Sequence, residues 1–520
     1  MSPPPRRPTV PAPAGSPGGR EVELKLAVDP ADLPRLKQHP LLKAQRPSTV
    51  RLEATYFDTT DLRLAEQDLT LRVRRTGRKH VQTVKSGSLR QIGLFEREES
   101  EHNVAEANPD LAAIGDAGLR RAVDGALKQH PLTAIFGTEV RRTRWHLGDG
   151  GKVAVDVDLD VGHLKAGGTE SPICEIELEL KRGRPRDLIR LARDLGRVVP
   201  LRLDVGSKAA RGFALYRGDI EGVRRAESLH LDKDATLGEA SLAALRESLA
   251  HVASNQRAVL SGRDIEGVHQ MRVGLRRLRA ALGLFRHQFR ASARDNLLGE
   301  LRWLAGALAP ARAWDVFLAE QLPPVAVALA GATELREIER AAGSLREAAY
   351  AEARAAIGSS RFLNLLLSAR LWLAEPPWAE DAGIDRSARD VAVEILDRRH
   401  RKARRLAKDA HRVEEAELHA LRLRLKKLRY ATEFFASLFP ERRVRTYLKA
   451  ISRPQQSLGH LNDSRSLRAL LEPLASRIGA DSGAKALGAV TGFHAGRTES
   501  LLAEARADVR DFARVRRFWS

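Results

Sequence analysis

The stretch EVELKL, residues 21–26, decides how the N-terminal half of the chain folds. Its residues alternate strictly, so Glu21, Glu23 and Lys25 lie on one face of an extended strand, while the valine and the two leucines lie on the other. One strand of this kind is typical of an ordinary amphipathic surface strand. The pattern therefore gains weight only if other strands repeat it.

Four further stretches place charged residues on one side of an alternating strand. They are LRVR at 71–74, VQTVK at 81–85, VAVDVDLD at 153–160 and CEIELEL at 174–180. Their apolar faces need a cover, which helical stretches near residues 31–42, 117–129 and 185–197 can supply. If those helices lie outside, the charged faces point into a closed or nearly closed antiparallel barrel.

The interior of such a barrel would be chemically specific. Buried charges must be paired or must bind ions. Carboxylates from adjacent strands make a hard oxygen site suited to Mg²⁺ or Mn²⁺, and arginine and lysine make a cradle for phosphate oxygens. We interpret this combination as a site for a metal–polyphosphate complex, although the spacing alone equally allows a structural ladder of salt bridges.

Composition narrows the class of protein. The chain has 520 residues, a formal net charge of +21, 5% aromatic residues and a single cysteine, Cys174. The charge favours anionic partners such as nucleic acid, an anionic membrane or phosphate polymers, but few aromatic side chains are available to stack bases. One cysteine excludes an internal disulfide framework and a cysteine-built zinc site. No window approaches the roughly 18 apolar residues of a membrane span, and the N-terminus lacks the apolar core of a signal peptide. We therefore expect a cytoplasmic protein.

A change of pattern divides the chain. Residues 1–19 are rich in proline, glycine and serine and are predicted to be a disordered arm. Residues 20–218 mix strands with short helices, residues 219–232 form a linker, and residues 233–520 are almost wholly helical in period.

The first of these halves resembles the CYTH, or triphosphate tunnel metalloenzyme, family. EVELK matches its ExExK signature, and the segments YFDTTDLRLAEQDLTLRVRR, VQTVK, FEREE, FGTEVRRTRW, VDLDVGHLKAG, PICEIELELKRG and VGSKAARGFALY follow in the family's order. The resemblance implies an antiparallel eight-stranded β-tunnel with flanking helices. It also implies dependence on Mg²⁺ or Mn²⁺ and hydrolysis of inorganic triphosphate to pyrophosphate and phosphate.

The resemblance also implies roles for individual residues. The predicted metal ligands are Glu21, Glu23, Glu175 and Glu177. The predicted phosphate-binding residues are Lys25, Arg72, Arg74, Lys85, Arg97, Arg142 and Lys208. Asp160 lies near the acidic set, and either Lys25 or Lys208 positions or activates the attacking water, so these three are the candidate catalytic residues.

The helical half contains an internal repeat. Residues 268–285 and 418–435 share one pattern at an offset of 150 residues, and LAPARAWDVF at 308–317 matches LGHLNDSRSL at 458–467 at the same offset. Each copy carries cations and one histidine along a single stripe of a helix. The stripes are His269, Arg272, Arg276 and Arg279 in the first copy and His419, Arg422, Lys426 and Arg429 in the second.

A solvated basic face is the simplest explanation of one such stripe. Two copies with a histidine at the same place favour a shared anion site, because pseudo-twofold packing would bring the stripes onto a common surface. A linear polyanion bound there would release counterions, so its affinity would depend strongly on salt. Arg398, Arg399, Lys402 and their neighbours in residues 394–408 either extend this basic surface or are solvated charges.

These repeated blocks resemble the CHAD family of conserved histidine α-helical domains. The resemblance implies two four-helix bundles related by an approximate twofold axis and the binding of long-chain inorganic polyphosphate. We also expect an association with polyphosphate granules. The predicted fold is thus a multi-domain α+β protein, with an all-α C-terminal domain.

Three alternatives to a triphosphatase follow from the same residues. The chain could be a non-catalytic protein that binds or senses phosphate polymers, or its tunnel could act on nucleotides as adenylyl cyclase-like relatives do. The basic surface alone would also suit nucleic acid.

Overall fold

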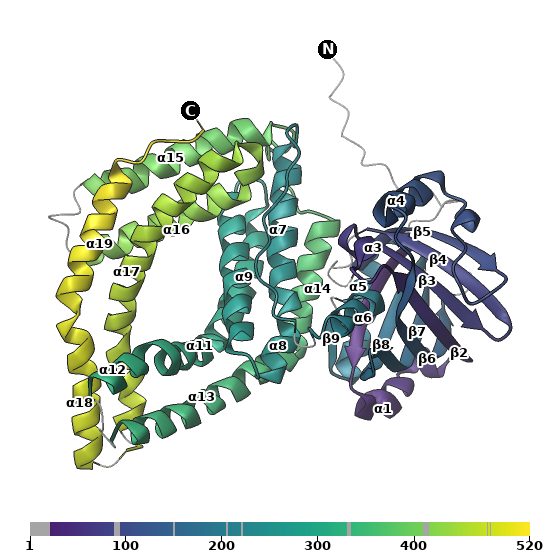
Figure 1. The fold of residues 1–520 in the computed structure, drawn as a ribbon, viewed down its shortest axis with the longest axis horizontal. Coiled ribbons are helices and arrows are strands. Elements are labelled where there is room, and N and C mark those ends of the chain that lie inside the picture. The colour runs from purple at the N-terminus through teal and green to yellow at the C-terminus, as the bar shows by residue number, and fades with distance from the viewer. Residues whose placement is uncertain are drawn as a thin grey trace. The chain divides into compact units, whose positions relative to one another are not determined.

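The computed structural model describes residues 21–87, 94–148, 151–203, 206–219, 222–329, 334–408, 415–475, 477–478 and 480–519. The side chains of residues 21, 94–99, 334, 415–416, 462–466 and 480–482 are not described. The chain divides into two compact units, Met1–Ile220 and Glu221–Ser520 (Figure 1). Within the described ranges, no helix has both the length and the apolar character that crossing a membrane requires.

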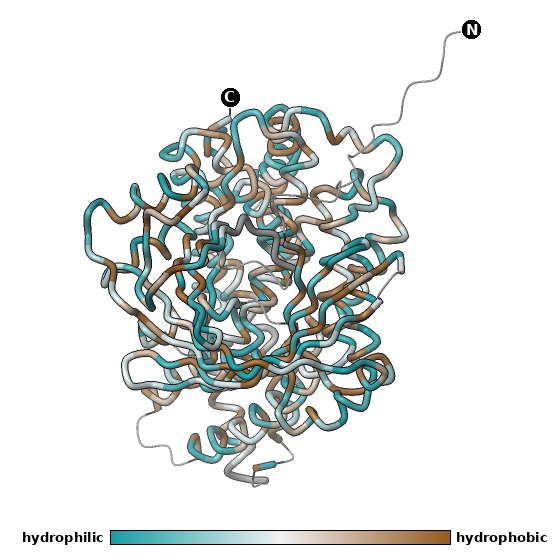
Figure 2. The backbone as a smooth tube through the Cα atoms, turned by 90° about the vertical axis from the view of Figure 1, so that its right-hand side faces the viewer, coloured by the Kyte–Doolittle hydropathy of each residue, from teal (hydrophilic) through white to brown (hydrophobic). Residues whose placement is uncertain are grey.

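An antiparallel sheet dominates the N-terminal unit. Its described strands are β1 (Glu21–Val28), β2 (Ser48–Asp58), β3 (Leu69–Thr76), β4 (Lys79–Ser86), β5 (Leu94–Val104), β6 (Thr133–Leu147), β7 (Ala154–Ala166), β8 (Thr169–Arg182) and β9 (Leu201–Leu203). The order is β5-β4-β3-β2-β6-β7-β8-β1, and β1 also pairs with β5, so eight strands close into a ring. The short strand β9 adds to β1. The predicted eight-stranded tunnel is confirmed, with one extra strand, and Figure 2 shows the strands bending round on themselves.

In the described part of this unit, six α-helices accompany the ring. They are α1 (Leu33–Lys37), α2 (Pro40–Lys43), α3 (Arg63–Glu66), α4 (Ala117–Leu127), α5 (Pro185–Val198) and α6 (Lys208–Tyr216). The three expected helical stretches correspond to α1 with α2, to α4 and to α5. Leu119 of α4 shares one hydrophobic cluster with Leu71 and Val73 of β3, and α5 contacts β1 and β8. Because side chains alternate along β3, Arg72 and Arg74 point away from α4, into the ring.

Helix α6 lies on the inner side of the ring, which the sequence analysis did not predict. Phe213 of α6 meets Phe136 of β6 edge to face at 5.1 Å, and Phe136 stacks on Tyr56 of β2 at 4.3 Å between ring centroids. The register places Tyr56 and Phe136 on the same face as the inward-pointing charges. Gly212 permits this close approach, since an added Cβ would lie 2.2 Å from the Phe136 ring. An apolar plug therefore fills part of the interior.

The C-terminal unit is helical. Its helices are α7 (Leu237–Ser254), α8 (Gln256–Ser261), α9 (Ile265–Leu284), α10 (Ala291–Ala307), α11 (Ala309–Val316), α12 (Leu322–Ala328), α13 (Glu334–Gly358), α14 (Ser360–Ala374), α15 (Ala388–Lys408), α16 (Glu415–Phe434), α17 (Glu441–Ala475), α18 (Ala480–Gly496) and α19 (Thr498–Ala513). This helical region and the sheet region confirm the predicted fold class.

Two contacts relate the repeated halves of this unit by a pseudo-twofold axis. Phe285 and Phe435, which correspond at the 150-residue offset, pack edge to face at 5.9 Å. Thr236 and Ser387, the residues that precede α7 and α15, form an isolated antiparallel bridge. A residue that contacts its own counterpart lies at the axis of an isologous arrangement. The two copies are therefore packed face to face across that axis.

Candidate functional site

The strand register gathers predicted tunnel residues on one face of the sheet. Arg142 stands opposite Asp160, Asp160 opposite Glu175, and Glu177 opposite Lys25. Directly opposed residues of an antiparallel pair point to the same side. Since helices cover the outer side, these five side chains point into the ring.

Three carboxylates form the centre of the interior. Asp160, Glu175 and Glu177 are buried, and each offers an oxygen within 4.8 Å of the others. The Lys208 ammonium lies 2.7 Å from Asp160 and 2.9 Å from Glu177, and it also pairs with Glu175. Lys25 donates to the same Glu177 oxygen at 2.7 Å. Strands β1, β7 and β8 and the first residue of α6 thus build one compact ionic cluster.

Two arginines complete the cluster. Arg142 donates through Nε to Asp160 at 2.7 Å and lies 2.7 Å from Asp158. Arg211, one helical turn after Lys208, pairs with Glu175. Sequence reasoning missed Arg211, although its i+3 spacing from Lys208 places both on one face of α6. Each central carboxylate therefore has at least one cationic partner.

These contacts fix the protonation states. Burial alone would raise the pKa of Glu177, but Lys208, Lys25 and Arg142 hold it well below its ordinary value. Burial alone would lower the pKa of Lys25, but the negative charges of Glu177 and Glu23 raise it above its ordinary value. Burial lowers the pKa of Lys208 too, yet Asp160 and Glu175 carry it well above its usual value. Both lysines are thus ammonium groups at neutral pH, which suits positioning a ligand better than accepting a proton.

A basic wall lies across the ring from this cluster. In the strand order, β3 and β4 are half-way round from β7 and β8. Arg72 and Arg74 of β3 point inward, and the register puts Lys85 of β4 on the same face. Arg74 lies 3.4 Å from Glu101, and its buried Nε has no hydrogen-bond partner among the described residues. Burial and the charge of Arg72 lower the pKa of Arg74. This wall can supply donors to an anionic ligand.

Tyr56 of β2 is a second residue that the sequence analysis missed. Its register partner is Arg72. Burial would raise the pKa of the Tyr56 hydroxyl, but Arg72, Lys208 and Lys25 lower it. Tyr56 therefore lies between the basic wall and the ionic cluster. The alternation of STVRLEATYFD at 48–58 is the sequence signal that could have placed it inside.

The remaining predicted tunnel residues are placed less completely. Glu23 is buried, and its carboxylate lies 3.2 Å from Lys25, outside the group of three close carboxylates. Glu21 and Arg97 oppose each other in the backbone register of β1 and β5, and their side chains fall outside the described set. Their functional roles stay predictions.

The close carboxylates fit a divalent cation. Mg²⁺ and Mn²⁺ prefer carboxylate oxygens, and here three buried carboxylates from adjacent strands converge. Lys208 contacts all three of them, Asp160, Glu175 and Glu177, so it marks the point where positive charge is stabilised. The donor set is therefore compatible with the predicted metal.

In the helical unit, the first basic stripe runs along α9. Arg272 donates to the Ala305 carbonyl at 2.8 Å, and its buried Nε has no hydrogen-bond partner among described residues. Burial, together with Arg276 and Arg312, lowers the pKa of Arg272 to about 10. Burial and Arg312 also lower the pKa of His269. Helix α11 thus adds Arg312 to the stripe, whose last member, Arg279, is exposed.

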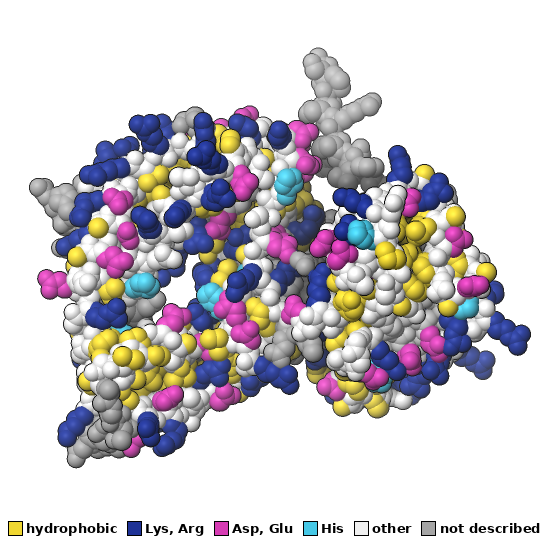
Figure 3. Space-filling model, in the orientation of Figure 1, with side chains coloured by type: hydrophobic (Ala, Val, Ile, Leu, Met, Phe, Trp, Pro, Cys, Tyr) yellow, Lys and Arg dark blue, Asp and Glu magenta, His cyan; other side chains and the backbone are white. Residues whose placement is uncertain are grey.

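The second stripe runs along α16 and is more solvent-accessible. His419 and Arg429 are exposed, Lys426 is half-buried, and Arg429 forms an ion pair with Glu433 at 2.7 Å. The Arg422 Nε is buried without a hydrogen-bond partner in the described part of the chain. Figure 3 shows lysine and arginine side chains spread over this unit, with acids between them. That the two stripes share one surface stays a prediction.

Domain models match both halves of the chain. The CYTH domain model matches residues 19–213, and the CHAD domain model matches residues 243–472. An inorganic triphosphatase from Haemophilus influenzae is 33% identical over 205 residues, which are 38% of this chain and 55% of that protein. The chain thus spans about half the length of this curated relative.

Solved structures resemble each unit separately. The CHAD domain from the plant Ricinus communis is 33% identical, and the match covers 56% of this chain and 97% of that one with a TM-score of 0.49. A putative adenylyl cyclase from Hippeastrum, described as having a dominant triphosphatase activity, is 20% identical. That match covers 38% of this chain and 95% of the other, with a TM-score of 0.30.

Proposed function

Since this chain carries a CYTH domain at residues 19–213 followed by a CHAD domain at residues 243–472, we propose that its tunnel hydrolyses inorganic triphosphate to pyrophosphate and phosphate. The observation that carries the proposal is the close carboxylate group of Asp160, Glu175 and Glu177 inside a ring whose opposite wall is basic. The triphosphatase of Haemophilus influenzae, similar over the tunnel region, supports the substrate class.

The residues of the basic wall and those of the ionic cluster would have different roles. Arg72 and Arg74 present planar donor groups that suit phosphate oxygens, and Lys85 adds a third cation. Lys25 and Lys208, both held as ammonium groups, orient the triphosphate and the attacking water and offset negative charge on the departing pyrophosphate. Asp160, Glu175 and Glu177 would hold Mg²⁺ or Mn²⁺, which when bound neutralises phosphate charge and lowers the pKa of water.

A substrate panel tests this proposal. Phosphate release from inorganic triphosphate, with Mg²⁺ or Mn²⁺ and with EDTA, is compared for the wild type, Glu175→Gln and the control Glu170→Gln, which alters an exposed carboxylate of the same strand. Because mutation of outer-shell partners of a metal already costs about 10–100-fold, we expect loss of a direct ligand to lower kcat/KM by about 100-fold or more, and the control to be unchanged. No metal-dependent release from triphosphate would instead favour a non-catalytic phosphate binder. Cyclic product from ATP would favour a cyclase.

We further propose that the helical unit binds long-chain polyphosphate through its two stripes. The buried guanidinium Nε atoms of Arg272 and Arg422 support this, because both are donors at corresponding positions of the repeat. The double variant Arg272→Ala/Arg422→Ala should bind polyphosphate more weakly, and its salt dependence should flatten by about 0.7 in log–log slope for each phosphate that the variant no longer neutralises. Arg302→Ala/Arg336→Ala removes the same charge elsewhere and serves as control. Equal effects of both pairs, or tighter binding to RNA at matched salt, would contradict the proposal.

A further inference from the structure

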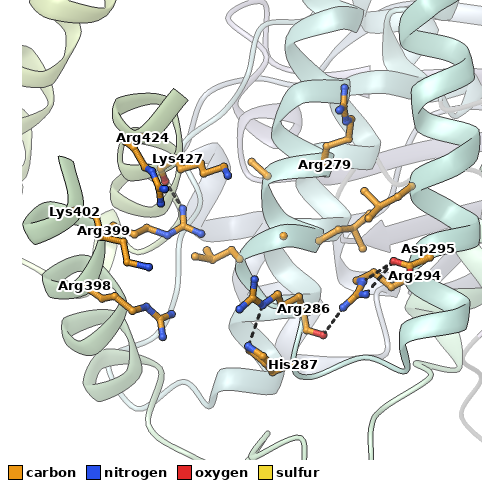
Figure 4. Close-up of a pocket in the computed structure, with 15 residues that line it drawn as sticks. Arg279, Arg286, His287, Arg294, Asp295, Arg398, Arg399, Lys402, Arg424 and Lys427 are labelled. Atoms are coloured by element: carbon orange, nitrogen blue, oxygen red, sulfur yellow. Dashed lines mark hydrogen bonds and ion pairs between the residues drawn. The ribbon is translucent and has the colours of Figure 1, made fainter. Parts of the chain in front are cut away.

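A basic cavity of about 420 Å³ lies between α9, α10, α15 and α16 (Figure 4). Of the described residues, eight lysines and arginines line it against one acid, Asp295, which Arg294 already binds at 2.9 Å. Several of the lining cations neither donate a hydrogen bond to nor form an ion pair with any described residue. They are Arg398, Lys402, Arg424 and Lys427. The cavity therefore holds a large excess of uncompensated positive charge.

The pseudo-twofold axis allows the residues around this cavity to be compared with their counterparts in the other repeat. In the first repeat, α7 packs directly on α9 at Gly274. A larger residue there would clash, because its Cβ would lie 2.9 Å from Val252 of α7. The corresponding residue of α16 is Arg424, which lines the cavity. A long side chain in place of glycine prevents the same close packing of α15 on α16.

The axis also explains the charge excess. Arg277 of α9, in the first repeat, is buried and donates a hydrogen bond to Glu433 of α16 at 2.9 Å. The residues that correspond to this pair are Lys427 and Gly283, so the second side keeps the cation and lacks the acid. Counted from Thr236 and Ser387, Arg398 of α15 likewise takes the position of Glu247 on α7. The Arg277–Glu433 pair is thus neutralised, whereas its counterpart, Lys427 with Gly283, leaves a positive charge at the cavity.

We propose that this cavity binds a compact inorganic oligophosphate of two or three phosphates, such as pyrophosphate. Guanidinium and ammonium groups converge from α15 and α16 on one side and from α9 and α10 on the other, as Figure 4 shows. Such a cluster suits adjacent phosphates, and among the described residues no phenylalanine, tyrosine or tryptophan lines the cavity to stack a base. The site is separate from the tunnel, and Arg279 is the one residue that it shares with the predicted stripes. It therefore goes beyond the proposed function.

The asymmetry itself provides the test. Gly283→Glu restores an acid where Glu433 stands on the other side, and Gly283→Gln adds the same volume without charge. An added Cβ at Gly283 meets no atom within 4 Å, so both variants should fold. Pyrophosphate binding to the full chain is measured by titration calorimetry in EDTA, which gives the number of sites and their affinities. Arg424→Ala, which removes a lining cation without adding an acid, is measured in parallel.

The wild type and Gly283→Gln should bind the same number of pyrophosphates with similar affinity. Gly283→Glu and Arg424→Ala should each weaken one site by about tenfold or more, since each disturbs charge-assisted hydrogen bonds. Hydrolysis of triphosphate should stay unchanged in all three variants, so failure of the tunnel proposal would be seen separately. Equal affinity in all four proteins, or equal losses in the Glu and Gln variants, would overturn the proposal. Binding of long-chain polyphosphate or of a nucleotide at this cavity, with no binding of pyrophosphate, would overturn it as well.

Discussion

Replacing Lys208 with methionine tests whether the centre of the tunnel is built for a divalent cation or only for salt bridges. The ammonium contacts Asp160, Glu175 and Glu177, all at most 7% exposed. Removing one partner of a buried ion pair costs about 3–5 kcal/mol because a charge is left uncompensated. We expect Lys208→Met to lower the free energy of unfolding in EDTA by about that amount.

Addition of Mg²⁺ or Mn²⁺ should then stabilise the variant more than the wild type. In the wild type the ion has to displace the Lys208 ammonium, whereas in the variant it replaces a missing charge. An ion that binds only the folded chain adds about 2.7 kcal/mol at a hundredfold excess over its Kd. Urea unfolding, followed by circular dichroism with and without metal, measures both effects.

Lys181→Met is the matched control. Lys181 is exposed and pairs with Glu179 farther along the same strand as Glu175 and Glu177, so its loss should cost less than about 1 kcal/mol and respond little to metal. If Lys208→Met were no less stable than this control, the cluster would not depend on its central cation. If metal restored nothing, the carboxylates would not be a cation site.

Other outcomes follow from single residues. His251 is fully buried, and burial lowers its pKa to about 4, so below pH 6.5 the unfolded chain binds more protons than the folded chain. The free energy of unfolding should therefore fall by up to about 3 kcal/mol as the pH falls from 6.5 to 4. Urea unfolding at several pH values should show a smaller fall for His251→Gln. Gly212→Ala forces a Cβ against the Phe136 ring and should cost about 1–3 kcal/mol, whereas Gly459→Ala, with open space around it, should not lower the thermal midpoint. Arg74→Ala should raise KM for triphosphate about tenfold or more in steady-state assays, because a buried donor of the basic wall is removed.

Strand parity made the tunnel predictable from the sequence. Alternation placed Lys25, Arg72 and Glu177 on charged faces, and the observed register brings these faces into one ring. This inference needs only the two-residue period of a strand and a cover for the apolar side. The helical repeat was visible for a similar reason, because its offset is constant.

The other features depend on contacts that a periodic pattern does not encode. The packing of α6 inside the ring requires Phe213, Phe136 and Gly212 to fit together, and each alone resembles an ordinary core residue. Arg211 became a site residue only through that packing, whereas the alternation along β2 already pointed to Tyr56. The basic cavity likewise arises where the two repeats differ, and comparison of the repeats emphasised where they agree.

The ionic cluster at the centre of the tunnel has a consequence for the release of anionic products. Its lysines and carboxylates form ion pairs with one another, so the protein's own groups neutralise the charges of the cluster. Binding of a phosphate anion together with a metal ion would then replace these ion pairs, with the lysines contacting the phosphate in place of the carboxylates. If the tunnel hydrolyses triphosphate as proposed, these pairs would re-form as pyrophosphate and phosphate leave, and their re-formation would offset the attraction between the cations and the two anionic products. A tunnel whose cations have such internal partners is expected to release anionic products more readily than one whose cations are unpaired.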